Sequence, residues 1–251
     1  MVHVEGHDTI VVIRLEHGKA NALDLELFGE LSDTIRRVRD SGVQAAVLTG
    51  TGSIFSAGVD LFRIIAGAEA YASQFIPAMA ATFLELFECP LPVVAAVNGH
   101  AIAGGCILAN ACDYRLMAEG KGTIGVPELA VGVEFPTVAL EIMRHSVAAH
   151  ELQALIYTGH LCVPGEARDR GLVDEVVPAE RLQSRALEIA RRMAQIPAEV
   201  FAVTKQALRR DALERMHGDT TRDDVVRRWS HPDTRRRIQE YLEATITRSR
   251  R

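Results

Sequence analysis

Short apolar runs that end at or beside a glycine recur along this chain and alternate with helical segments. "VQAAVLTG", "PVVAAVNG" and "DYRLMAEG" each read as a strand, because each run is short, apolar and closed by a turn residue. Helical patterns occupy the intervals around residues 69–88, 103–112 and 137–157. A strand–helix repeat of this kind predicts an α/β fold in which most strands pair in parallel.

The two ends of the chain depart from this repeat. Near the N-terminus, "MVHVE" and "TIVVIRLE" flank the turn "GHD", which predicts a hairpin. A helix follows in "LDLELFGELSDTIRRVRDSG", with Asp24 as its cap, Gly42 at its end and its apolar side chains on one face. After Pro197 no strand pattern remains. We therefore divide the chain into an α/β core, residues 1–196, and a C-terminal helical region, residues 197–251.

The length and composition suit one domain with an appendage. The chain has 251 residues, and 48% hydrophobic side chains are enough to bury a large core. No apolar run approaches the roughly 20 residues that span a bilayer, and the N-terminus lacks the pattern of a signal peptide. The four cysteines lie in apolar surroundings without metal-type spacing, which is typical of buried thiols in a reducing compartment. We expect a cytoplasmic protein with no membrane segment and no metal.

The charge is distributed unevenly along the chain. Residues 205–251 hold 13 basic and 8 acidic side chains, whereas residues 1–204 hold 15 basic and 25 acidic ones. The arginines of the tail alternate with acids in helical patterns, which indicates a helical face that contacts solvent or another subunit. A nucleic-acid-binding surface would be more one-sided and would carry exposed aromatic residues. We expect no nucleic-acid partner; a weak nucleic-acid role for the tail stays open, as does an anionic small ligand.

Two turns that contain glycine each join a strand to a helix. "LTGTGSIFSAGVDLF" places Gly58 at such a junction, and Gly104 follows the strand "VVAAVNG" in the same way. Glycine lets a backbone approach a ligand closely, and the first amides of a helix have no partner inside it. Two such turns can direct N–H groups at one oxygen atom and form an oxyanion hole. Neither turn has the pattern of a Walker A loop or of a dinucleotide-binding fingerprint.

Four motifs in order and register point to a known family. "NALDLELFGEL", "FSAGVDL", "AAVNGHAIAGGCILANACDYRL" and "IGVPELAVGV" resemble the corresponding segments of the crotonase superfamily, the enoyl-CoA hydratases and isomerases. The resemblance extends over essentially the whole chain, including "GLVDEVVPAERL". It implies a spiral of repeated ββα units, a C-terminal helical region used to form a trimer or a dimer of trimers, and an acyl-CoA thioester as substrate. Coenzyme A is then part of the substrate, and no other cofactor is expected.

The same resemblance assigns roles to individual positions. It implies that the amides of Val59 and Gly104 form the oxyanion hole, and that Gly105 keeps side-chain bulk away from the acyl chain. Apolar residues of "YASQFIPAMAATFLELF" are expected to line the acyl tunnel. Ala57 is expected near the adenine. The segments implied to line the coenzyme A site contain Lys19, Ala20, Ala22, Leu23, Ser56, Ala57, Gly58, Asp60 and Leu61.

Ile107 is the informative departure from the hydratase pattern. Hydratases that this chain resembles usually carry two glutamates, one three residues after the central glycine and one in a later "PE" motif. Here the first position is Ile107 and the second is Glu128. Hydration calls for a group that activates water and a group that protonates carbon, whereas a double-bond shift needs only one base. The pattern therefore favours an isomerase that converts a 3-enoyl-CoA into a 2-enoyl-CoA in fatty-acid oxidation, with Glu128 as base and Ile107 against the substrate.

Other readings of the site stay open at this stage. Glu134 lies six residues beyond Glu128 and is a candidate second acid, which would make the protein a hydratase. A protein that binds acyl-CoA without turnover is the third possibility. Lys205 and Arg63 are candidate partners for the phosphates of coenzyme A, since fixed cations pair well with phosphate oxygens. His100 follows a strand end, where a histidine satisfied by local hydrogen bonds is the commoner case.

Overall fold

The computed structural model describes residues 1–249, so the last two residues of the predicted helical region lie outside it. The strands are β1 (Val2–His7), β2 (Ile10–Leu15), β3 (Ala45–Thr49), β4 (Ile54–Ser56), β5 (Val93–Val97), β6 (His100–Ile102), β7 (Tyr114–Ala118), β8 (Ile124–Gly125), β9 (Leu161–Cys162) and β10 (Glu175–Val177). The main helices are α1 (Leu25–Asp40), α2 (Leu61–Glu88), α3 (Gly104–Ala111), α4 (Glu128–Val131), α5 (Thr137–Ser146), α6 (Ala149–Thr158), α7 (Pro164–Asp169), α8 (Leu182–Ala194), α9 (Ala198–His217), α10 (Arg222–Ser230) and α11 (Pro232–Ser249).

Three consecutive ββα units form the centre of the molecule, as expected for a crotonase-like spiral. They are β3–β4–α2, β5–β6–α3 and β7–β8–α4. The first strand of each unit joins a six-stranded sheet of order β1-β2-β3-β5-β7-β10, in which all neighbours except β1 and β2 pair in parallel. The second strand of each unit joins a smaller sheet of order β4-β6-β8-β9. The repeat therefore places equivalent parts of the three units side by side.

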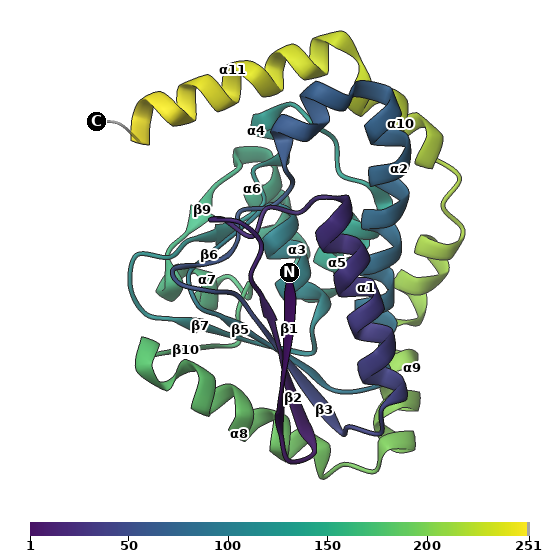
Figure 1. Ribbon diagram of the computed structural model, residues 1–251, viewed down its shortest axis with the longest axis vertical. Coiled ribbons are helices and arrows are strands. Elements are labelled where there is room, and N and C mark those ends of the chain that lie inside the picture. Colours follow the sequence, from purple (N-terminus) through teal and green to yellow (C-terminus); the bar gives the residue numbers. More distant parts are fainter. Residues whose placement is uncertain (250–251) are drawn as a thin grey trace.

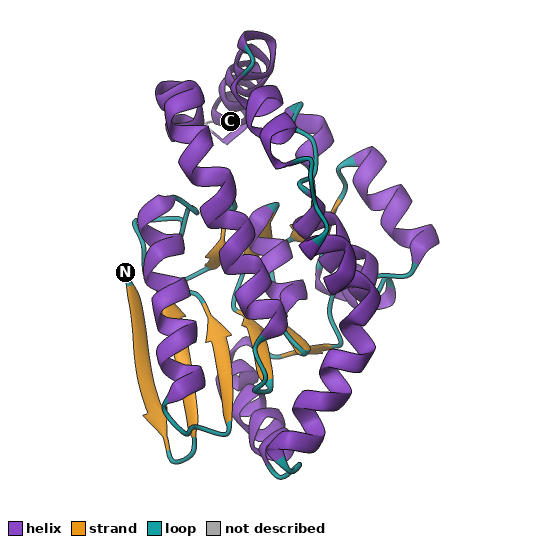
Figure 2. Cartoon of the chain, turned by 90° about the vertical axis from the view of Figure 1, so that its right-hand side faces the viewer, coloured by secondary structure: helices purple, strands orange, loops and turns teal. Residues whose placement is uncertain are grey.

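The large sheet is covered on both faces, which explains why its strands are apolar throughout. Alternate residues of β2, β3 and β5 point to opposite sides: Val12 and Val47 pack with Leu187 of α8, whereas Ile13 and Leu48 pack with α1 and α2. Figure 1 shows α8 below the sheet and α1 with α2 beside it, and Figure 2 shows the helices that stand in front of the strands. The predicted N-terminal hairpin is confirmed as β1 and β2.

Capping hydrogen bonds and local backbone conformation set the helix boundaries, and some of these boundaries differ from the sequence prediction. Asp24 caps α1 as predicted, because its carboxylate accepts a hydrogen bond of 2.8 Å from the amide of Leu27. Helix α2 begins at Leu61, well before the predicted start near residue 69, since Asp60 caps it in the same way. Its axis is interrupted at Ala68, which has φ 45°. The helix predicted for residues 137–157 is two helices, because Val147 adopts an extended conformation between α5 and α6.

The C-terminal region folds back over the core. As predicted, the described residues after Pro197 are helical, and they form α9, α10 and α11. Helix α10 packs along α2, and α11 crosses α2 and α4 at one end of the molecule (Figure 1). None of the helices within residues 1–249 has the length and apolar character needed to cross a membrane.

Candidate active site

The candidate site lies where three equivalent turns meet. Strands β4, β6 and β8 are neighbours in the small sheet, so the turns that follow them are neighbours too. Each turn opens a helix of its unit and contributes to a common pocket, with Val59 before α2, Gly104 at the start of α3 and Glu128 at the start of α4. The repeat of the fold thus gathers residues that are 69 positions apart in the chain.

Glycine is required for the first two turns to approach each other. Gly58 has φ +85°, and a Cβ atom there would lie 2.6 Å from the carbonyl oxygen of Ile102 and 3.3 Å from the amide nitrogen of Gly104. Ala103, which precedes Gly104, adopts φ 51° although it is not a glycine. Backbone strain of this kind persists only where the surroundings hold it, and it concentrates at functional sites.

Two backbone amides at this junction are free to bind a ligand. Leu23 bonds through its amide to the oxygen of Gly58 and through its oxygen to the amide of Asp60, so the amide of Val59 between them points to the other side. Gly104 is the first residue of α3, where an amide has no acceptor within the helix. Within residues 1–249 neither amide has a hydrogen-bond acceptor. The arrangement can therefore accept a negatively charged oxygen.

Glu128 is a buried carboxyl group without a partner. The residue is 6% exposed, and its Oε2 atom has no hydrogen bond to any described residue. Burial raises the pKa of the Glu128 carboxyl to about 8, because an apolar environment disfavours the charged form. A carboxyl group with such a pKa can accept a proton near neutral pH and give it up again.

The wall beside Glu128 is apolar. Ile107, one turn into α3, is 3% exposed and lines the same pocket. Among the described residues that line the pocket, Glu128 is the only one with a carboxylate side chain. The pocket holds about 570 Å³ of space, with the solvent at its mouth included. The chemistry available here is therefore one proton acceptor and two amide donors that line the same apolar pocket.

The two segments predicted to form the coenzyme A site are joined at the mouth of this pocket. The amide of Ala57 donates a 2.9 Å hydrogen bond to the oxygen of Ala20, and the Ser56 hydroxyl donates one of 2.7 Å to the oxygen of Asn21. Ala57 is exposed, and with Leu61 it lines the pocket. The other predicted residues lie close by: Lys19 is exposed, Ala22 is half-buried, and Leu23 is buried beneath the turn.

The structure gives a different reason for a glycine at position 105 from the one expected. A Cβ atom at this position would lie 2.4 Å from the carbonyl oxygen of Ser56 in β4, and Gly105 does not line the pocket. Its small size therefore allows α3 to pack against the strand. The expectation that it clears a path for the acyl chain has no support in this geometry.

Glu134 and Lys205 have partners outside the pocket. Both carboxylate oxygens of Glu134 accept hydrogen bonds from Nε of Arg228, at 2.6 and 2.7 Å. The Lys205 ammonium is 6% exposed and lies 2.8 Å from the Asp113 carboxylate. Neither side chain lines the pocket, so the geometry supports neither a second acid at Glu134 nor a phosphate ligand at Lys205.

Two further candidates also have local partners. Arg63 forms ion pairs with Glu26 and, at 3.1 Å, with Asp24, although more than a third of its side chain remains exposed. The Nδ1 atom of His100 lies 3.0 Å from the Thr123 hydroxyl, the local satisfaction that the sequence favoured.

Several lining residues lie outside the motifs that identified the site. Met79 lines the pocket from the segment of α2 that was expected to do so. Trp229 of α10 and Tyr241 of α11 also line the pocket, which the sequence did not predict. The only sequence signal for them is that they are aromatic residues at helical positions in an arginine-rich tail. The remaining apolar wall includes Ile102, Pro127, Val131, Val133, Pro136 and Ala139.

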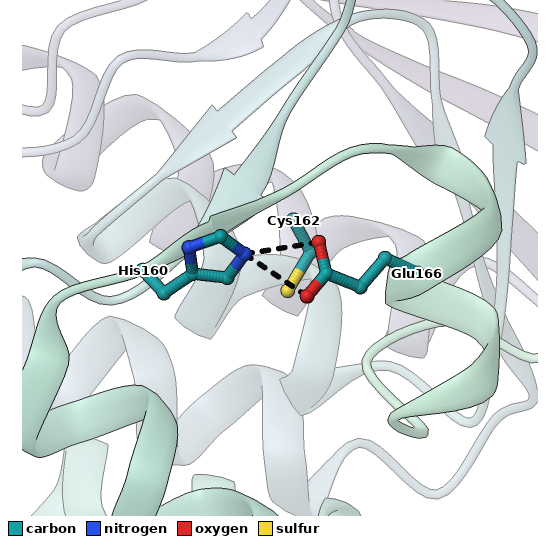
Figure 3. Close-up of side chains that lie close together, drawn as sticks. All are labelled: His160, Cys162 and Glu166. Atoms are coloured by element: carbon teal, nitrogen blue, oxygen red, sulfur yellow. Dashed lines mark hydrogen bonds and ion pairs between the residues drawn. The ribbon is translucent and has the colours of Figure 1, made fainter.

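His160, Cys162 and Glu166 form the group that most resembles a metal site within residues 1–249 (Figure 3). Their ligand atoms lie within 4.8 Å of one another, and these side-chain types bind zinc. However, His160 Nε2 lies 2.9 Å from both Glu166 oxygens, and Arg170 Nε lies 3.0 Å from one of them. Burial raises the pKa of the Cys162 thiol to about 11. His160 and Glu166 therefore bond each other, and none of the three side chains lines the pocket.

The chain is similar to known proteins over almost its full length. Residues 5–246 match the family described as enoyl-CoA hydratase/isomerase. The mitochondrial enoyl-CoA delta isomerase 1 of Homo sapiens is 30% identical over 241 residues, which are 93% of this chain and 79% of the human protein. A putative enoyl-CoA hydratase of Thermus thermophilus is 34% identical over 213 residues, 83% of each chain. The crystal structure of human mitochondrial delta3-delta2-enoyl-CoA isomerase superposes with a TM-score of 0.91, 30% identity and 98% coverage of both chains.

Proposed function

Because this chain belongs to the enoyl-CoA hydratase/isomerase family, we propose that it moves the double bond of a 3-enoyl-CoA to the 2-position in fatty-acid oxidation. The observation that carries the proposal is the solitary carboxyl group of Glu128, which shares the pocket lining with Ile107 instead of with a second acid. Relatives named as isomerases and relatives named as hydratases have similar identities to this chain, so the choice between the two reactions depends on these residues.

In the proposed reaction Glu128 removes a proton from carbon 2 of the thioester. The electron pair left on carbon 2 delocalises into the thioester carbonyl, and the resulting negative oxygen accepts hydrogen bonds from the amides of Val59 and Gly104. Each donor of this kind contributes roughly 100- to 1000-fold to the rate in other enzymes. Glu128 then returns the proton to carbon 4, and the double bond forms between carbons 2 and 3. The proton transfers balance, so the proposal assigns no cofactor beyond coenzyme A itself.

Hydration is disfavoured by the same pocket. A water molecule that attacks carbon 3 must be held and deprotonated while another group protonates carbon 2. The side chain of Ile107 offers no hydrogen bond to that water, and the Glu134 carboxylate is bound to Arg228. The apolar environment that raises the pKa of Glu128 also favours excluding the water.

The test is a product assay on the unmodified protein with two substrates. A 3-enoyl-CoA should give increasing absorbance of the conjugated thioester, while crotonyl-CoA should be hydrated poorly. The Glu128→Gln protein, purified in the same way, controls for contaminating enzymes. Efficient hydration with negligible isomerisation would contradict the proposal and require a second acid. Tight binding of both thioesters without any product would support the alternative of a non-catalytic binder.

We also propose that the protein self-associates, as a trimer or a dimer of trimers. Helix α9 and the segment just before it expose four apolar side chains that are 43–72% accessible in the single chain: Ile196, Val200, Val203 and Leu208. An apolar face of this size is unfavourable in water and suits an interface. Light scattering after gel filtration would measure the mass; a monomer at micromolar concentration would contradict this part of the proposal.

A further inference from the structure

The C-terminal helices add two aromatic side chains, Trp229 and Tyr241, to the lining of the pocket. Ala57 at the mouth is exposed, whereas Trp229 is 3% exposed. The free amides of Val59 and Gly104 belong to the same lining. An acyl thioester bound to those amides therefore directs its coenzyme A toward the exposed mouth and its hydrocarbon chain toward Trp229.

Trp229 is held in place by two contacts of the same loop. Its indole Nε1–H donates a 3.3 Å hydrogen bond to the carbonyl oxygen of Glu134. The neighbouring Arg228 binds the Glu134 carboxylate. The side chain that the sequence suggested as a second acid thus holds α10 against the loop that follows α4, and a rotation of the indole ring would break its hydrogen bond to Glu134.

Tyr241 contributes to the same wall from α11. This helix is packed tightly onto α4: Gly132, which ends α4 with φ +91°, leaves room for Arg237, whose Cβ would lie 3.1 Å from a Cβ at position 132. A glycine is needed there for both the backbone angle and the close approach. Trp229 and Tyr241 therefore reach the pocket from two helices that each pack against the segment following Glu128.

We infer that Trp229, with Tyr241, is the end wall that limits the length of the acyl chain that the pocket accepts. The inference rests on the proposed function for the orientation of the substrate. Each methylene buried before the wall should tighten binding about fourfold. Beyond the wall, an added methylene finds no apolar space, and the affinity should stop rising or fall.

The experiment measures dissociation constants of saturated acyl-CoA thioesters of increasing chain length, which needs no turnover. The unmodified protein should show a break in the series. Trp229→Ala should move the break to longer chains, while Trp229→Phe, which keeps most of the wall, should move it less. Tyr241→Ala tests the second wall residue on its own helix in case Trp229→Ala does not fold. Tyr157→Ala, which truncates a 70% exposed aromatic residue of α6 outside the pocket, is the control and should leave the series unchanged.

The outcomes separate this inference from the proposed reaction. A series without a break, or a break that both Trp229→Ala and Tyr241→Ala leave in place, overturns the end wall even if isomerisation is observed. A break that moves in either variant supports the wall even if the protein fails to isomerise any 3-enoyl-CoA, in which case only the reaction is wrong.

Discussion

Glu128 and Glu141 are both buried glutamates, yet their surroundings differ completely. Glu141 is 2% exposed, and its carboxylate accepts hydrogen bonds of 2.6 Å from Arg144 and from Arg215. Glu128 is 6% exposed and its Oε2 atom has no partner among the described residues. A buried charge normally requires a counter-charge or hydrogen bonds, so an unpaired carboxyl group costs stability. The fold therefore gives hydrogen-bond partners to Glu141, whose carboxylate holds helices together, and leaves Oε2 of Glu128 available for chemistry.

The largest expected effect is on turnover. Glu128→Gln keeps the shape of the side chain but cannot accept a proton, so isomerisation should drop by roughly 100-fold or more while thioester binding changes little. Glu141→Gln should keep turnover within a few-fold, because Glu141 faces arginines and not the pocket. Steady-state kinetics on both proteins check the pair. Similar losses in the two variants would remove the distinction between them.

The next effect is a gain in stability that depends on pH. Burial raises the pKa of the Glu128 carboxyl from 4.5 to about 8 in the folded chain, so between these values the folded state keeps a proton that the unfolded state has released. Stability contributed at this position therefore falls as pH rises from about 4.5 to 8. Glu128→Gln escapes this loss and should be more stable than the unmodified protein by on the order of 2 kcal/mol at pH 7. Urea unfolding at pH 5, 7 and 8 should show the difference growing with pH.

A loss of stability is expected for the matched substitution of the paired carboxyl group. Glu141→Gln removes a charge that two arginines share, and it should lower the free energy of unfolding by about 1 kcal/mol. The expected loss of stability is modest because the side chains of Arg144 and Arg215 are about half exposed, so water can solvate them after the substitution. The same urea series measures it, and a stabilised Glu141→Gln protein would show that the pairing does not favour folding.

The smallest expected effect concerns Glu134, a carboxylate paired with Arg228. If it serves only to hold α10 over the pocket, Glu134→Gln should change the rate constant of isomerisation by less than about tenfold, below the range of a general acid or base. A 100-fold loss would restore Glu134 as a second acid. Kinetics on the 3-enoyl-CoA substrate, measured beside Glu128→Gln, decide between these roles.

Much of the core and of the site could be predicted from the sequence, because both depend on local patterns. Apolar runs, turn residues and family motifs predict the strands that alternate with helices, the Asp24 cap and the ββα spiral. The approach of Gly58 to Gly104 follows from two similar strand–helix junctions. These features are encoded within short stretches of the chain.

The remaining features depend on contacts between segments that are far apart in the sequence. Lys205 has the charge of a phosphate ligand, but its burial against Asp113 becomes visible only when α9 is packed on the core. Trp229 reaches the pocket because α10 lies along α2. The reason for Gly105 is likewise a distant backbone atom, the Ser56 oxygen. A local sequence pattern cannot identify such distant partners.

Burial raises the pKa of the Glu128 carboxyl group, which makes its ionised form a stronger base, and infrared spectroscopy tests this directly. The difference spectrum between the unmodified protein and Glu128→Gln isolates the carbonyl stretch of a protonated carboxyl group at position 128. The band should persist at pH 6 and disappear as the pH passes through about 8, the value to which burial raises the pKa of this group. Loss of the band near pH 4.5, the ordinary range of a glutamate, would show that the carboxyl group is solvated or paired and would contradict the account.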